Sequence, residues 1–97
     1  MARVVLAEEL HDDFKRILAH LSELGEQVSL SRIAEIVAAF DVLETSPLIG
    51  RPVEHGRREL VIGTGRGGSI ALYQYVSELD VVFVLAVRAQ REAGYRG

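Results

Sequence analysis

The run Asp80-Val-Val-Phe-Val-Leu-Ala-Val87 and the segment that follows it, Arg88-Ala-Gln-Arg-Glu-Ala-Gly-Tyr95, carry the pattern that decides the fold. The run is rich in β-branched and aromatic residues and follows a Ser77-Glu-Leu-Asp80 turn, so it predicts a strand from 81 to 88. Arginine and tyrosine have polar heads that require water or a specific acceptor, unlike residues that only fill a core. The segment at the end of this strand is therefore the first place to look for function.

Two further strands are expected upstream of this one. They are Arg58-Glu-Leu-Val-Ile62 and Ile70-Ala-Leu-Tyr-Gln-Tyr-Val76, joined by the glycine-rich stretch 63–68. Three strands with short connections predict an antiparallel meander. Tyr73 and Tyr75 are two residues apart on one strand and so share a face, where we expect packing in the core or across strands.

The start of the chain predicts a strand that leads directly into a helix. Arg3-Val-Val-Leu6 is a short apolar, β-branched run. From about Glu8, apolar residues recur at intervals of three and four, which places them on one helical face. Acidic residues near the start complement the helix dipole, and Gly25 marks the end. The apolar face comprises Leu10, Phe14, Ile17, Leu18, Leu21 and Leu24.

A second amphipathic helix is expected to start near Ser29 or Ser31, either of which can cap it. It ends at Ser46-Pro47, because the residue before proline is pushed out of helical geometry. The short connection 26–28 predicts an antiparallel helical hairpin. The resulting fold class is α+β, with the hairpin packed on an antiparallel sheet in the order β-α-α-β-β-β. We expect one domain over residues 1–97, since this length suffices for a single modest core.

Composition narrows the classes of function. No stretch approaches the roughly 20 apolar residues of a membrane span, and the amino terminus lacks a signal-like pattern, so we expect a cytoplasmic protein without membrane contacts. The chain has no cysteine, which excludes disulfides and thiolate sites. The histidines are scattered, so we expect neither a metal site nor a cofactor. They are His11, His20 and His55.

Charge is distributed unevenly within the net charge of -3. Residues 1–50 carry four Lys or Arg against nine Asp or Glu, whereas residues 51–97 carry seven Arg against five Asp or Glu. The arginine fork suits bidentate contacts with carboxylate or phosphate. A nucleic-acid binder driven by phosphate contacts is usually far more basic. The basic second half therefore indicates a protein partner, or only a solvated sheet edge.

The stretch Gly63-Thr-Gly-Arg-Gly-Gly68 invites comparison with phosphate-binding loops. A Walker loop requires Lys followed by Ser or Thr and then a helix, and a dinucleotide fingerprint also opens a helix. Here a strand follows, so we interpret the stretch as a hairpin loop. Arg66 stands at its tip, where it is placed to contact a partner.

Five segments carry a resemblance to a known family: Ser46-Pro-Leu-Ile-Gly-Arg-Pro52, Arg58-Glu-Leu-Val-Ile-Gly63, Ile70-Ala-Leu-Tyr73, Val84-Leu-Ala-Val-Arg88 and Gln90-Arg-Glu-Ala-Gly-Tyr95. With the order of elements above, they resemble the RelE/ParE superfamily of bacterial toxins over nearly the whole chain. The resemblance implies the toxin of a type II toxin-antitoxin module for plasmid stabilisation, which inhibits growth and is neutralised in a complex with a cognate antitoxin. RelE-like toxins cleave messenger RNA on the ribosome, whereas ParE-like toxins inhibit DNA gyrase.

The resemblance also implies where a nuclease site lies. Aligned from the carboxyl end, Tyr95 and Arg91 match a tyrosine and an arginine of the nucleases, and with Arg88 they form the candidate catalytic set. Ala89 falls where a catalytic arginine stands, and where many relatives carry histidine. Alanine does no acid-base or electrostatic work, and the sequence leaves open whether this alanine is natural or engineered.

The middle strands depart from the nuclease pattern as well. Ile70 falls at another catalytic-arginine position, and Leu60 and Ile62 fall where the nucleases have lysines. Arg58 or Arg66 is then a spatial substitute. The candidate residues for binding a target or an antitoxin are Arg58, Arg66, Arg88 and Arg91.

Three functions follow from this set of residues. The favoured one is a toxin that binds an essential target, and the alternative is a ribosome-dependent mRNA endoribonuclease. The third is a domain whose exposed edge only mediates oligomerisation, as a dimer or with another chain. In that case Arg88 and Arg91 pair with Glu78, Asp80 or Glu92 at the sheet edge, and Tyr95 packs over the sheet.

Overall fold

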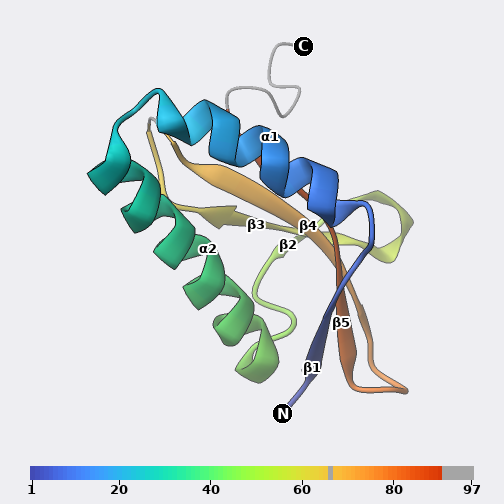
Figure 1. Ribbon diagram of the computed structural model, residues 1–97. Helices are drawn as coiled ribbons and strands as arrows, with labels where there is room; N and C mark the ends of the chain where they lie inside the picture. The colour runs from blue at the N-terminus through green and yellow to red at the C-terminus, as the bar shows by residue number, and fades with distance from the viewer. Residues whose placement is uncertain (66, 91–97) are drawn as a thin grey trace.

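The helices lie on one face of a sheet, in the α+β arrangement and the order that the sequence predicts (Figure 1). This computed structural model describes residues 1–65 and 67–90. In this part of the chain a two-residue strand and a short 3-10 turn, neither of them predicted, precede the meander. The elements are β1 Arg3–Leu6, α1 Leu10–Ser22, α2 Glu26–Thr45, β2 Arg51–Pro52, the 3-10 turn Glu54–Gly56, β3 Arg58–Ile62, β4 Ser69–Val76 and β5 Val81–Ala89.

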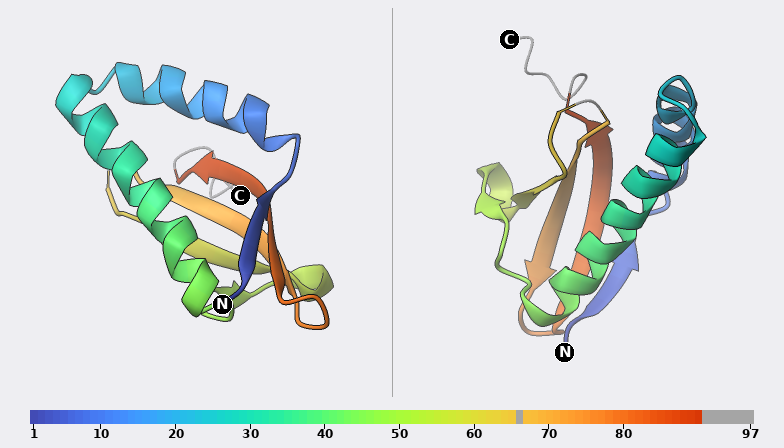
Figure 2. Two further views of the ribbon diagram at one scale, coloured as in Figure 1. Left: turned by 60° about the horizontal axis from the view of Figure 1, so that its bottom comes forward. Right: turned by 90° about the vertical axis from the view of Figure 1, so that its left-hand side faces the viewer.

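The strands form one sheet in the order β1-β5-β4-β3-β2. The pairs β2–β3, β3–β4 and β4–β5 are antiparallel, which confirms the predicted meander. The amino-terminal strand β1 lies at the sheet edge and runs parallel to β5, with Arg3 opposite Val81. Figure 2 shows in its right-hand view that both helices cover the same face of the sheet. No helix of residues 1–65 and 67–90 covers the opposite face.

The second helix begins earlier than the sequence predicted. It starts at Glu26 rather than at Ser29 or Ser31, and the connection is residues 23–25. Gly25 has φ 99°, a conformation that glycine adopts readily, and it reverses the chain within this short connection. Ser29 is not a cap: its hydroxyl donates to the carbonyl of Leu21 at 2.8 Å and so ties the two helices together.

The two helices form the predicted hairpin, and they diverge from their connecting turn (Figures 1 and 2). Each helix follows a different part of the sheet. The helix α1 is tied to β5 by Asp13, and the end of α2 is tied to the start of β1, where the Ala2 N–H donates to the Glu44 carbonyl at 2.8 Å. The divergence leaves an apolar groove between the helices, described below.

The tyrosines of β4 share one face and pack in or against the core, as predicted, and this face is the helix side. Tyr73 is fully buried in the core, and Tyr75 packs against that core. The hydroxyl of Tyr73 accepts a hydrogen bond from the Gly50 N–H at 2.8 Å, while the hydroxyl of Tyr75 donates to Asp80 at 2.8 Å. This hydrogen bond, reinforced by burial and by the charge of Asp80, raises the pKa of Tyr75 above its ordinary value.

The two hydroxyls are expected to differ in their contribution to stability. Tyr73→Phe leaves the buried Gly50 N–H without its acceptor and should lower the free energy of unfolding by about 2 kcal/mol. Tyr75→Phe removes an exposed hydrogen bond and should cost less than about 0.5 kcal/mol. Urea unfolding of both variants measures the difference. Equal losses would show that the Gly50 contact does not matter.

A buried carboxylate joins α1 to the end of β5. Asp13 is 9% exposed, and its Oδ2 accepts a hydrogen bond from the Val87 N–H at 3.0 Å. Its Oδ1 accepts one from Arg16 at 3.2 Å. The pairing of β1 with β5 ends at Val84, so β1 offers no acceptor to the Val87 N–H. The carboxylate of Asp13 accepts that hydrogen bond instead. No local sequence pattern indicates that this acidic residue of the first helical turn is buried.

Asp13→Ala is expected to lower the free energy of unfolding by about 2 kcal/mol, because it leaves the Val87 N–H without its acceptor. The matched control is Asp12→Ala, which removes an exposed carboxylate from the same helical turn and should cost about 0.5 kcal/mol. Denaturant unfolding measures both. A cost for Asp13→Ala no greater than that of its neighbour would contradict the role of the buried contact.

Candidate functional site

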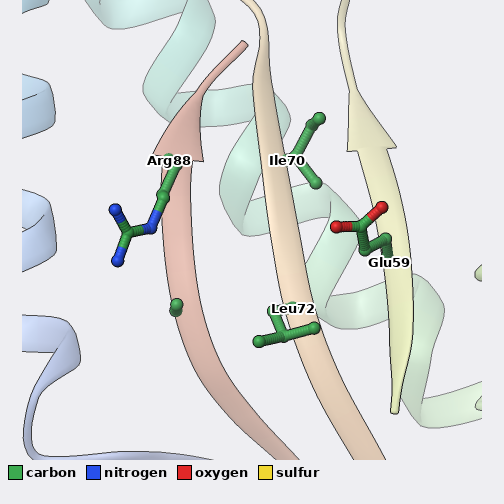
Figure 3. A pocket seen from close by; sticks show the side chains of 5 residues that line it. Glu59, Ile70, Leu72 and Arg88 are labelled. Carbon is green, nitrogen blue, oxygen red and sulfur yellow. The ribbon is translucent and has the colours of Figure 1, made fainter. Parts of the chain in front are cut away.

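A shallow pocket lies on the face of the sheet that has no helix over it (Figure 3). Its volume is about 210 Å³, and it spans the three strands β3, β4 and β5. The residues that line it are Glu59, Ile70, Leu72, Ala86 and Arg88. Across the sheet, Ile70 pairs with Arg88 and Leu72 with Ala86, so the pocket follows from the register of the strands.

A β-bulge turns Arg88 toward this pocket. Leu72 pairs with Ala86 but Tyr73 pairs with Val84, so Leu85 is an extra residue in β5. Before the bulge Val82 and Val84 are buried in the core, and after it Val87 is. With strict alternation, Arg88 would share the buried face of Val82 and Val84. The bulge reverses the alternation and places this cation on the open face.

The floor of the pocket is apolar and its two charges are opposite in sign. Ile70, Leu72 and Ala86 provide the floor. Arg88 is exposed at one side, and within residues 1–65 and 67–90 it forms no ion pair, neither with Glu78 nor with Asp80. Glu59 at the other side accepts from Arg51 Nη2 at 3.0 Å. An uncompensated cation beside an apolar floor suits contact with an acidic, partly apolar protein surface.

The structure places the candidate residues at different positions. Arg88 lines the pocket, while Arg66, Arg91 and Tyr95 lie outside the described residues. Arg58 is away from the pocket and half-buried. Its Nη1 donates to the carbonyls of Leu48 at 3.2 Å and Gly50 at 2.8 Å, so these contacts hold the loop after α2.

The positions that depart from the nuclease pattern provide no cation in the described structure. Ala89 is 5% exposed and, two residues from the buried Val87, lies on the face opposite Arg88. Ile70 is a floor residue of the pocket. Ile62 is buried in the core, and Leu60 packs against it on the helix side. Glu59 and Leu72 were not predicted, since only the register between strands brings them to Arg88.

A second concave surface lies between the two helices. It has a volume of about 380 Å³ and an entirely apolar lining. The lining residues Leu6, Leu18 and Val37 are 47%, 48% and 55% exposed, which is unusual for large aliphatic side chains. Phe14 and Phe40 meet across the groove with ring centroids 6.4 Å apart. The remaining lining residues are Ile17, Ile33 and Ile36.

Two further kinds of site, a metal cluster and a membrane-spanning helix, are absent from the described part of the chain. No group of three or more His, Asp or Glu side chains there is arranged to hold a metal ion. None of the helices described is long and apolar enough to cross a membrane.

Comparison with known proteins matches residues 4–94 to the model of the ParE toxin of the type II toxin-antitoxin system parDE. The chain belongs to the ParE toxin family. It is thus a RelE/ParE superfamily toxin, the toxin component of a type II toxin-antitoxin system, and such a toxin has an antitoxin partner. No curated protein sequence is significantly similar to it.

Solved structures of other toxins share the fold of this ParE-family toxin. A mutant of the Escherichia coli toxin RelE in the free state is 22% identical, with a TM-score of 0.57, and the match covers 97% of this chain and 88% of that one. A metal-bound toxin from Helicobacter pylori is 15% identical, with a TM-score of 0.50, covering 96% and 99%. At these identities the likeness confirms the fold.

Proposed function

We propose that this ParE-family toxin inhibits growth by binding DNA gyrase through the open sheet face that carries Arg88. The observation that supports it most directly is the composition of the pocket, with one arginine at the side of an apolar floor. Exposed arginines beside apolar surface are typical anchors of protein interfaces. The chain also matches the ParE family model, and the resemblance described under Sequence analysis implies that ParE-like toxins inhibit gyrase.

The pocket is poorly suited to the alternative, cleavage of messenger RNA. Attack by a ribose hydroxyl needs a group that accepts its proton, a group that protonates the leaving oxygen, and cations for the developing charge. Among the described lining residues only Arg88 is a cation, and Glu59 is an anion held by Arg51. A carboxylate at this place repels a phosphate. The described residues therefore favour binding over phosphodiester chemistry.

The apolar groove between α1 and α2 supports the antitoxin as the second partner. We propose that one amphipathic helix of the antitoxin fills it, because helices present apolar residues at the spacing that such a groove accepts. Arginine-to-carboxylate contacts on the sheet then add to the binding, in a cytoplasmic hetero-oligomer that stabilises a plasmid. In this proposal residues 1–97 act as one toxin domain.

The test is inhibition of DNA supercoiling by purified gyrase at increasing toxin concentration, with and without the product of the neighbouring gene. We expect inhibition that the neighbouring product relieves. The parallel assay measures cleavage of messenger RNA in a translation extract, where we expect the message to stay intact in the presence of toxin. An Ala89→His variant is included because the resemblance implies histidine at this position. Cleaved message with active gyrase would overturn the proposal in favour of the endoribonuclease.

A further inference from the structure

The last described residue, Gln90, connects the end of β5 to both ends of the glycine-rich loop. Its backbone N–H donates to the Gly68 carbonyl at 2.9 Å, and its side-chain Nε2 donates to the Gly63 carbonyl at 2.8 Å. The last pair of the β4–β5 ladder is Ser69 with Ala89, so these contacts fix the chain one residue beyond that ladder. Gln90 itself is half-buried.

The loop that receives Gln90 is held from its other side by α2. Arg32 donates from Nη2 to the Thr64 carbonyl at 2.9 Å, and its Nη1 pairs with Glu35 at 2.9 Å. Its side chain is only 20% exposed. The helix, the loop and the end of β5 are thus linked by hydrogen bonds that involve three separate parts of the sequence.

Two glycines of the loop leave room for these side-chain contacts. A Cβ atom on Gly63 would lie 2.6 Å from Arg32 Nη1, and one on Gly68 would lie 2.6 Å from Gln90 Nε2. At either position a Cβ atom would force the end of the neighbouring side chain to move out of its hydrogen bond. Gly63 also has φ 69°, in the left-handed region that favours glycine. The glycine pattern that invited comparison with a phosphate-binding loop therefore makes room for the side chains of Arg32 and Gln90.

We propose that Gln90 is a positioning residue for the gyrase-binding face: its carboxamide ties the end of β5, two residues after Arg88, to the glycine-rich loop. The proposal rests on the proposed function for its consequence and on the contacts above for its geometry. Arg88 lies one residue before the end of the β4–β5 ladder, where strands fray. Because the Gln90 carboxamide holds the chain just beyond this point, it limits the orientations available to the Arg88 side chain. Arg32 supports the loop from α2.

The test is Gln90→Glu, which keeps the shape but replaces the donor by a carboxylate facing a carbonyl. Gln27→Glu is the control, because it makes the same chemical change at an exposed glutamine of α2, on the other side of the sheet. We expect the concentration for half-inhibition of gyrase to rise about 10-fold for Gln90→Glu and to stay within about 2-fold for Gln27→Glu. Affinity for the antitoxin should fall less than inhibition of gyrase in Gln90→Glu, because the groove between α1 and α2 is the main antitoxin contact, and should stay within about 2-fold in the control.

Amide hydrogen exchange of the free toxin tests the geometry without gyrase. In Gln90→Glu the amides of Arg88, Ala89 and Gln90 should exchange about 10-fold faster, with the core amides of Tyr73 and Val82 unchanged. Faster exchange throughout would show a role in global stability only and overturn the proposal, as would unchanged exchange at the end of β5. The wild-type toxin could leave gyrase active while exchange in Gln90→Glu is faster only at the end of β5. That result would confirm that Gln90 holds the end of β5 but would refute gyrase as the target.

Discussion

Arg88→Ala is expected to raise the toxin concentration needed for half-inhibition of gyrase about 30-fold, and growth arrest should be lost at expression levels at which the wild type is toxic. Arg88 is the cation of the pocket, it is exposed, and it lies beside the apolar floor of Ile70 and Leu72. Truncating a central arginine of an interface costs about 2 kcal/mol of binding free energy. That cost corresponds to about 30-fold in affinity.

The matched control for this variant is Arg57→Ala. Arg57 is also exposed, and it follows the 3-10 turn before β3, away from the pocket. Inhibition by Arg57→Ala should stay within about 2-fold of the wild type. Both variants should unfold at the same denaturant concentration as the parent and bind the antitoxin, since neither side chain is in the core. If Arg57→Ala weakens inhibition as much as Arg88→Ala, inhibition depends on the overall positive charge of the toxin and not on a specific contact of Arg88.

Gly50→Ala is expected to lower the free energy of unfolding by about 3 kcal/mol. Gly50 is buried where the chain passes between β3 and the ring of Tyr73. A Cβ atom there would lie 2.7 Å from the Glu59 carbonyl oxygen and 2.8 Å from the Tyr73 hydroxyl. One of these neighbours is backbone of a paired strand, so the methyl group forces the chain and the strand apart.

Gly65→Ala is the control for the glycine effect itself. No atom lies within 4 Å of a Cβ at this position, but its φ is 70°, which costs an alanine about 1 kcal/mol. Urea unfolding of the two variants separates steric overlap from backbone strain. If both variants lost the same free energy of unfolding, the structure around Gly50 would accommodate the added methyl group, and Tyr73 and Glu59 would not confine the chain there.

Periodicity in the sequence was sufficient to predict the strands and helices, because apolar spacing reports directly which face of an element is buried. It failed at Glu26, where the positive φ of Gly25 allows α2 to begin without a capping serine. It also could not reveal the two-residue strand β2, which includes a proline and forms only by pairing with β3.

The site could be predicted only in part. The polar end of the last strand drew attention to Arg88, which lines the pocket, but adjacency in sequence suggested that Arg88 and Ala89 belong to one site. The bulge at Leu85 and the pairing with β4 decide which of them faces the pocket, and both depend on contacts between distant segments. Arg58 looked like a free cation from sequence, because hydrogen bonds to the Leu48 and Gly50 carbonyls leave no local pattern.

The parallel pairing of β1 with β5 has a consequence for how the toxin is made. Arg3 pairs with Val81, so the first strand waits for nearly the whole chain to emerge from the ribosome before it finds its neighbour. Contacts between such distant residues close a long loop and slow folding. During synthesis the backbone edge of β1 therefore stays unpaired until β5 has formed, and the sheet is completed only in a late step of folding.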